Sequence, residues 1–305
     1  MTETEFYQQL DEMLLNNTGN VFELMEEYGN EHNHGEYDRY HIIYTLVNYL
    51  EEKNYRPSAE RMDELWQIAS FYESTRLVDT LLVLQDGKCS FDTLIYLLET
   101  EFAKGFEYVF NLINEYPNSY RYEPDDYLYG LLKTIIQDFH SLIQGGEILR
   151  YFLKLWTSSP ILQKDLNQLI YDVLTFISNV QAASILMEFG ADPFANYYKG
   201  DVDTGIPIVF KVMQNNPRDI ETLLECTVEA ENWNILDEWG RNLLHYAASN
   251  QEIYEALLQK GVDPDHRAEI KDQNKVVVAK MKGTLPKEYG KTPREIFEET
   301  RVEPR

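Results

Sequence analysis

The chain has 305 residues, of which 52 are Asp or Glu and 27 are Lys or Arg, so its formal net charge is −25 at pH 7. This charge argues against a protein that binds nucleic acid through its phosphates and against one that adsorbs to an anionic membrane, because the electrostatic contribution to either contact would be repulsive. Hydrophobic residues make up 44% of the chain and aromatic residues 13%, which is enough for a core. We therefore expect a folded protein whose partner, where charge contributes to the contact, is basic.

Targeting signals and disulfides are not indicated by the sequence. The N-terminal residues MTETEFYQQL have neither the basic nor the apolar region of a secretory signal, and no apolar stretch approaches the roughly 18 residues of a membrane span. Cys89 and Cys226 are far apart and have no Cys or His at metal-binding spacing. They are typical of buried thiols in a reducing compartment, so we expect a cytoplasmic protein.

From Glu3 to Phe189 the apolar residues recur at helical spacing, and we find no strand pattern before residue 190. Helices separated by short polar breaks are typical of stacked helical hairpins, so residues 1–180 are predicted to form an all-α solenoid body. The predicted helices are a short pair on either side of Asn16–Gly19, and then His41–Leu50, Glu60–Tyr72, Leu77–Leu84, Phe91–Glu101, Gly105–Glu115, Tyr127–Ile143, Glu147–Thr157 and Leu162–Ile177.

A more specific pattern occupies residues 181–305. Residues 237–248 read DEWGRNLLHYAA, and residues 256–263 read ALLQKGVD. Together they resemble an ankyrin repeat, whose usual pattern is D-x-x-G-x-T-P-L-H-x-A-A followed by L-L-x-x-G-A-D. Asn242 and Leu243 stand where Thr-Pro is usual. The residues that fit the pattern include Gly240, Leu244, His245, Ala247, Leu257, Leu258, Gly261 and Asp263.

Partial matches flank this repeat. Residues 185–193, ILMEFGADP, resemble the end of a preceding repeat. Asp201, Pro207 and Ile208 resemble the start of another, in which Pro207 stands 36 residues before Leu243, the equivalent position. Thr292 and Pro293 resemble the start of a terminal repeat, 50 residues after Leu243. Since the ankyrin period is about 33 residues, an insertion of roughly 17 residues lies within Asp265–Tyr289, before the terminal repeat. The resemblance predicts an ankyrin-repeat region that continues the solenoid body.

The resemblance also implies roles for the motif residues. Gly240 and Gly261 suit tight turns in which a side chain would strain the backbone. Thr292 and Pro293 suit the first turn of a helix, for which proline has the required φ angle. His245 occupies the position whose imidazole ordinarily hydrogen-bonds to the backbone between repeats, so a structural role is expected for it.

The insertion before the terminal repeat is rich in lysine. Around Val276–Met281 its residues alternate, which predicts a short β-hairpin over residues 266–287. This hairpin is either an arm that binds a partner or a cap over the last repeat. Its lysines are candidate binding residues in an otherwise acidic protein: Lys271, Lys275, Lys280 and Lys282.

Motifs for catalysis are not found, and no cofactor is expected. Gly290-Lys291-Thr292 imitates the end of a phosphate-binding loop, but Leu285 occupies the position of its first glycine. His32, His34 and His41 form a weak candidate metal site, for which a solvated polar loop between helices is the alternative.

Aromatic residues are predicted at the tips of the repeats, where ankyrin proteins recognise other proteins. Tyr and Trp are over-represented among the residues that dominate binding energies. The alternative for Trp233 and Trp239 is packing against the neighbouring repeat. The candidate partner-binding residues are Phe194, Tyr197, Tyr198, Trp233 and Trp239.

The hypothesis that these features favour is a non-catalytic protein–protein interaction module that binds and neutralises a basic partner. Immunity proteins neutralise toxins in this way, and the irregular repeats resemble those of bacterial proteins. The first alternative is a secreted ankyrin effector that targets a host protein, with an activity in residues 1–180, and the second is an acidic mimic of nucleic acid. Residues 1–260 hold 43 acidic and 17 basic residues, so a basic partner is expected to contact the body.

Overall fold

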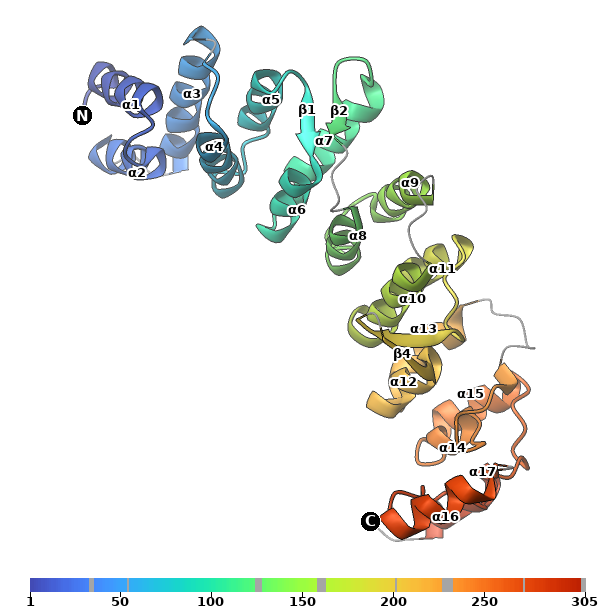
Figure 1. Cartoon of the computed structure of the whole chain (residues 1–305). Coiled ribbons are helices and arrows are strands. Elements are labelled where there is room, and N and C mark those ends of the chain that lie inside the picture. Colours follow the sequence, from blue (N-terminus) through green and yellow to red (C-terminus); the bar gives the residue numbers. More distant parts are fainter. Residues whose placement is uncertain are drawn as a thin grey trace. The chain divides into compact units, whose positions relative to one another are not determined.

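The computed structural model describes residues 1–32, 36–53, 55–123, 128–157, 163–200, 202–226, 233–270 and 272–302. The chain divides into two compact units, Met1–Ile148 and Leu149–Arg305, and the division falls within helix α9 (Gly145–Thr157). Both units are built mainly of helices (Figure 1). The predicted boundary between residues 180 and 181 lies inside the second unit, at the start of a helix.

The first unit is a series of helical pairs. Within it, α2 packs on α4 and α6 packs on α8, while α3, α5 and α7 pack in sequence in a second row. The prediction of stacked helical hairpins is therefore confirmed within this unit. Its elements are α1 (Glu3–Asn16), α2 (Val21–His32), α3 (Glu36–Lys53), α4 (Ala59–Phe71), α5 (Thr75–Leu84), β1 (Lys88–Ser90), α6 (Phe91–Glu99), α7 (Ala103–Glu115), β2 (Arg121–Glu123) and α8 (Leu128–Gln137).

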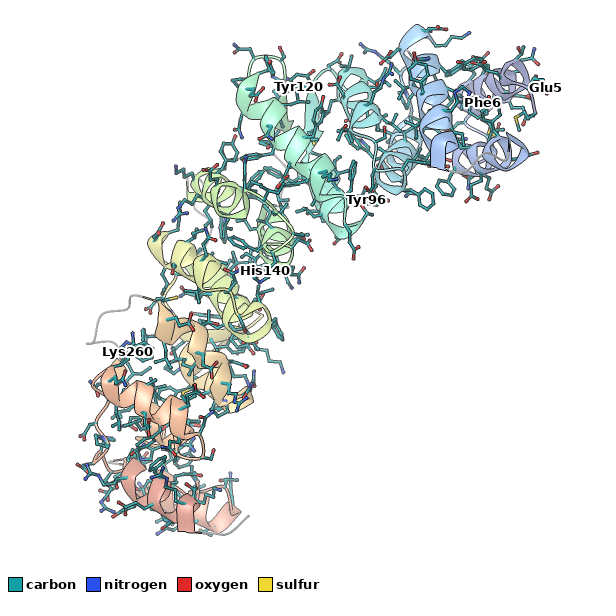
Figure 2. The ribbon with its side chains drawn as sticks, turned by 180° about the vertical axis from the view of Figure 1, so that it is seen from behind. Glu5, Phe6, Tyr96, Tyr120, His140 and Lys260 are labelled. Carbon is teal, nitrogen blue, oxygen red and sulfur yellow. The ribbon has the colours of Figure 1, made fainter. Side chains whose placement is uncertain are left out.

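Serine side chains set the starts of three of these helices. Ser58, Ser74 and Ser90 precede α4, α5 and α6, and each hydroxyl accepts a hydrogen bond from the backbone N–H three residues later, at 3.3, 3.2 and 3.1 Å. These bonds satisfy donors that a helix N-terminus leaves open. Apolar side chains that recur at helical spacing then fill the core, beginning with Phe6 (Figure 2). The Phe6 ring lies 4.6 Å from that of Tyr28 between ring centroids.

Two short strands occur where the sequence shows no strand pattern. β1 and β2 pair in parallel, with Cys89 opposite Tyr122. Gly87 precedes β1 at a φ of +75°, and a Cβ atom there would lie 1.9 Å from the carbonyl oxygen of Ser119. Each strand has three residues, too few for a detectable alternation, so the tertiary approach of these two loops and not the local sequence produces the pairing.

A buried arginine on α4 holds the connection between α1 and α2. The guanidinium of Arg61 donates to the carbonyl oxygens of Thr18, at 2.5 Å, and Gly19, at 3.0 Å. It also pairs with Glu64, whose carboxylate accepts the N–H of Val21 at 2.5 Å. The charges of Arg61 and Glu64 are thus satisfied by each other and by the ends of two helices, as burial requires.

The second unit has two rows of helices. α10, α12, α14 and α17 pack successively in one row, and α11, α13 and α15 in the other. Pairing of one helix from each row is the arrangement expected of stacked repeats. The elements are α10 (Gln163–Asp172), the π-helical turn η1 (Val173–Ile177), α11 (Val180–Glu188), β3 (Asn196–Lys199), β4 (Val202–Pro207), α12 (Ile208–Asn215), the 3₁₀ turn η2 (Pro217–Ile220), α13 (Glu221–Glu225), α14 (Leu243–Ala247), α15 (Gln251–Gln259), α16 (Gln273–Lys282) and α17 (Pro293–Val302).

The β-hairpin predicted over residues 266–287 is wrong, because residues 273–282 form the helix α16. Asp272 caps its start by accepting the N–H groups of Asn274 and Lys275, and Gly283 ends it at a φ of +68°. The buried residues Val276 and Ala279 are three positions apart, which is helical spacing. A hairpin does occur earlier, where β3 and β4 pair antiparallel.

No helix in the described part of the chain is both long enough and apolar enough to span a bilayer.

Arg61 provides a test of the packing in the first unit. We expect Arg61→Ala to lower the free energy of unfolding by about 3 kcal/mol, because it leaves Glu64 and two carbonyl groups without their partner. Urea titration followed by circular dichroism measures this change. The matched control is Arg56→Ala, which breaks the exposed pair with Asp86 and is expected to cost less than about 1 kcal/mol. Equal effects of the two substitutions would contradict the role assigned to Arg61.

Candidate protein-binding site in the C-terminal repeats

Asp237 organises the turn that precedes α14. One carboxylate oxygen accepts the N–H groups of Trp239 and Arg241, both at 2.8 Å. The other accepts the Arg241 Nε–H and the Tyr246 hydroxyl, both at 2.7 Å. Burial, followed by the charge of Asp237, raises the pKa of Tyr246, so this hydroxyl remains a donor.

Arg241 extends this cluster to a segment 47 residues away. Its guanidinium stacks 4.5 Å from the ring centroid of Tyr246 and lies 3.4 Å from the carboxylate of Glu288. Glu288 belongs to the loop before α17, so the cluster joins the turn at Asp237 to the terminal repeat. Sequence reasoning did not identify these residues. The available signal was the Asp237–Arg241 pair, four residues apart across a turn.

His245 connects the same two repeats. Its Nε2 atom lies 3.1 Å from the carbonyl oxygen of Lys291, which can only accept, so Nε2 donates there. Its Nδ1 atom lies 3.1 Å from the backbone nitrogen of Asn242 and 2.7 Å from the side-chain oxygen of the same residue. Asn242 replaces the usual threonine and also donates to the carbonyl oxygen of Asp263 at 2.7 Å. Burial lowers the pKa of His245, which keeps the imidazole neutral in this arrangement. Its role is structural because both ring nitrogens are engaged with the chain.

The two motif glycines differ in their surroundings. Gly240 has a φ of +72°, and a Cβ atom there would lie 2.3 Å from the carbonyl oxygen of Glu269. Gly261 has a φ of +83° but nothing within 4 Å of the same position. Gly240 is therefore required both by backbone conformation and by the close approach of another segment, whereas Gly261 is required by conformation alone.

Four aspartates of the second unit make the same local hydrogen bond. Each accepts the backbone N–H two residues later: Asp192 from Phe194, Asp203 from Gly205, Asp237 from Trp239 and Asp263 from Asp265, at 2.7 to 2.9 Å. Such bonds are typical of turns that begin with aspartate. Asp203 lies on β4, whereas the other three lie in loops of the second unit, where these bonds help to fix the loop conformation.

The aromatic candidates for partner binding lie in different environments. Trp233 is fully buried and packs edge-on against Phe194, 5.5 Å away between ring centroids, so it is a core residue and not an anchor at the surface. Lys260, at the end of α15 (Figure 2), has its ammonium 5.7 Å from the centroid of the Trp233 ring. Tyr197 and Tyr198, both on β3, are half-buried, and the Tyr197 ring lies 4.6 Å from that of Tyr171.

The lysine candidates on α16 differ in their surroundings. Lys275 is engaged within the chain: its ammonium lies 2.8 Å from the carboxylate of Glu238 and 4.7 Å from the ring centroid of Trp239, which is half-buried. Lys280 and Lys282 are exposed on the same helix. Lys271 lies outside the described residues.

The candidate metal site falls mostly outside the described part of the chain. His34 lies outside it, and so does the side chain of His32, whereas His41 is exposed on α3. Among the described side chains, no three of the types His, Cys, Asp and Glu are grouped so that they could hold a metal ion.

At the start of α17, Thr292 and Glu295 form a reciprocal cap. The Thr292 hydroxyl accepts the N–H of Glu295 at 3.2 Å, and the carboxylate of Glu295 accepts the N–H of Thr292 at 2.8 Å. Pro293 is the first residue of this helix, where its lack of an N–H group removes no bond. The terminal repeat therefore begins with a capped helix, and the Lys291 carbonyl just before it lies within hydrogen-bonding distance of His245.

The contrast between the two glycines is testable. We expect Gly240→Ala to lower the free energy of unfolding by roughly 3 kcal/mol, because the new methyl group meets the backbone of Glu269 in addition to straining φ. Gly261→Ala, which adds only the strain, should cost about 1 kcal/mol. Urea denaturation of both variants measures the difference, and equal costs would contradict the close approach at Gly240.

His245 predicts a pH dependence of stability. Its pKa in the folded chain lies below the ordinary value of 6.5, so the unfolded chain binds this proton more readily. The stabilising contribution of the neutral imidazole is complete above that value and decreases as the pH falls below it. Unfolding should be compared between about pH 5 and pH 8 for the wild type and His245→Gln. The variant is expected to be less stable at neutral pH and to show a weaker loss towards low pH, whereas parallel pH profiles would contradict this assignment.

The family model for the ankyrin repeat matches residues 239–269, which include the turn at Gly240, α14 and α15. A comparison with curated proteins finds no matching relative. The matched segment contains Gly240 and His245 and begins two residues after Asp237, and neighbouring helices of the unit stack in two rows. Residues 239–269 of this chain thus match the ankyrin repeat, within a unit whose helices stack in two rows.

Proposed function

We propose that this chain is a non-catalytic interaction protein that binds a basic protein through its first unit and neutralises it, as an immunity protein neutralises a toxin. The observation that carries the proposal is the distribution of charge. Residues 1–148 contain 28 acidic and 9 basic residues, a net charge of −19 out of −25 for the whole chain. The ankyrin repeat is itself a protein-interaction module, so a protein partner agrees with both units.

The surface of the first unit supports a basic partner. Glu23, Glu26 and Glu27 on α2 are exposed, and the first 38 residues contain no Lys or Arg. The buried Arg61 is already occupied by Glu64 and the carbonyl groups that it binds. A negative electrostatic potential that few basic residues of the unit neutralise increases the association rate with a positively charged partner and lowers the dissociation rate of the complex.

Neutralisation follows from the same electrostatics. A toxin that acts on nucleic acid needs a basic surface to bind phosphates. An acidic protein that covers this surface blocks the substrate without performing any reaction. A competition experiment with DNA tests where the captured partner is bound. If DNA competes with this chain, the chain occupies the phosphate-binding surface and mimics nucleic acid; if DNA does not compete, the chain binds elsewhere on the partner.

The proposal predicts a complex that depends on salt and on the charge of α2. The full-length chain should capture basic proteins at about 50 mM salt and lose them at about 500 mM, since screening shortens the range of the interaction. The variant Glu23→Gln/Glu26→Gln/Glu27→Gln is expected to bind the captured protein about tenfold more weakly, mainly through slower association.

A matched control changes three exposed acids of the second unit. Glu221→Gln/Glu252→Gln/Glu298→Gln removes the same charge from the other unit and should have a smaller effect. Capture that is indifferent to salt, capture of acidic proteins only, or equal effects of the two triple variants would contradict the proposal. Pull-down with mass spectrometry, followed by binding kinetics with the purified partner, gives these measurements.

A further inference from the structure

α16 has apolar residues on two opposite sides. Val276 and Ala279 are each 4% exposed and pack against the rest of the second unit. Val277, Val278 and Met281 are 53%, 47% and 83% exposed, and we refer to these three residues as the outer face of α16. At about 100° per residue, the outer face points away from the buried pair. Burial of Val276 and Ala279 anchors the helix, whereas the exposed residues of the outer face do not contribute to this anchoring.

The helix is preformed and anchored. Asp272 caps its N-terminus, and the backbone N–H of Thr284 donates to the carbonyl oxygen of Ala279 at 2.9 Å beyond its C-terminus. Lys275 ties its inner edge to Glu238 and to the ring of Trp239. A partner that binds the outer face therefore has no helix to fold, which reduces the entropic cost of association.

The residue types of the outer face are unfavourable in water. Valine has a lower helix propensity than the polar residues that usually occupy an exposed helical position, because its branched side chain loses χ1 freedom. Two adjacent valines and a methionine also leave apolar surface in contact with solvent. Contiguous apolar surface of this kind marks an interaction site on a soluble protein. Coverage by another apolar surface accounts for the presence of these residues at exposed positions.

Charge indicates the nature of that surface. Between Asp272 and Lys287 the sequence contains four lysines and one acidic residue, in a protein with a net charge of −25. Lys280 and Lys282 are exposed, and helical geometry places them on the two flanks of the outer face. This arrangement is complementary to an apolar strip bordered by carboxylates.

We propose that the outer face of α16 is a docking site for an acidic amphipathic segment of a protein partner. The apolar side chains of that segment cover Val277, Val278 and Met281, and its carboxylates pair with Lys280 and Lys282. This partner is opposite in charge to the one proposed for the first unit. The chain thus has two binding surfaces of opposite sign, and the second does not depend on the first.

The test uses the full-length chain and two fluorescent helical peptides. Both peptides have Leu at positions i, i+3, i+4 and i+7, and the remaining positions are mainly Glu in one and Gln in the other. Fluorescence anisotropy at about 150 mM salt, where the field of the first unit is largely screened, measures their affinities. The Glu peptide is expected to bind at least tenfold more tightly than the Gln peptide.

Two variants separate apolar from charged contributions. Val277→Ser/Met281→Ser should weaken binding of both peptides by about tenfold or more, because it removes the apolar contact. Lys280→Glu/Lys282→Glu should reduce binding of the Glu peptide to the level of the Gln peptide or below it. The control Lys199→Glu/Val202→Ser makes the same kinds of change at exposed residues of the β3–β4 hairpin and should leave both affinities unchanged. Circular dichroism verifies that each variant is folded.

Three outcomes would overturn the proposal. The first is equal binding of the two peptides by the wild type, and the second is binding that the α16 variants do not alter. The third is that neither peptide binds, while the outer face is needed for binding to vesicles with about 30% phosphatidylserine or for self-association measured by sedimentation equilibrium. None of these outcomes changes the salt-dependent capture predicted for the first unit.

Discussion

A helical pair cannot bury both of its apolar faces by itself, and the remainder of this structure follows from that constraint. In the second unit, α10, α12, α14 and α17 cover one another in one row, and α11, α13 and α15 do so in the other. Polar bonds then fix the register between neighbours. His245 donates to the carbonyl oxygen of Lys291, and Arg241, already paired with Asp237, also lies 3.4 Å from the carboxylate of Glu288, so polar contacts join α14 to the terminal repeat. Loss of the His245 contact leaves a buried ring N–H without its acceptor, which makes the stacking specific.

The charge of the molecule is arranged by unit, and this arrangement connects the fold to the proposed functions. The first unit carries −19 of the total −25, and its α2 helix presents Glu23, Glu26 and Glu27 to solvent. In the second unit, the lysines of α16 stand beside an exposed apolar strip. The two proposals, a basic partner for the first unit and an acidic segment for α16, both rest on this distribution of charge. Lys275 links α16 to Trp239, in the segment that matches the ankyrin repeat, and to Glu238, the residue just before that segment.

The helices of both units were predictable because their apolar residues recur every three or four positions and because caps such as Ser90 mark their starts. α16 was not predictable in the same way. Val276–Met281 satisfies an alternating pattern as well as a helical one, and the distinction depends on Val276 and Ala279 being covered by the rest of the unit. Trp233 illustrates the same limit for the candidate site. Its position in a loop is visible in the sequence, but its complete burial against Phe194 is a property of packing.

The sequence by itself determined the helical periodicity, the segregation of charge and the ankyrin pattern around Gly240 and His245, since these depend on residue order alone. Only the tertiary structure decided which side chains remain available for binding. Lys275 is engaged by Glu238 while Lys280 is exposed, although both are lysines of one helix. Gly240 is enclosed by Glu269 while Gly261 is open, although both have positive φ. The physical reason is that accessibility and close approach arise from segments distant in sequence, and no local pattern encodes them.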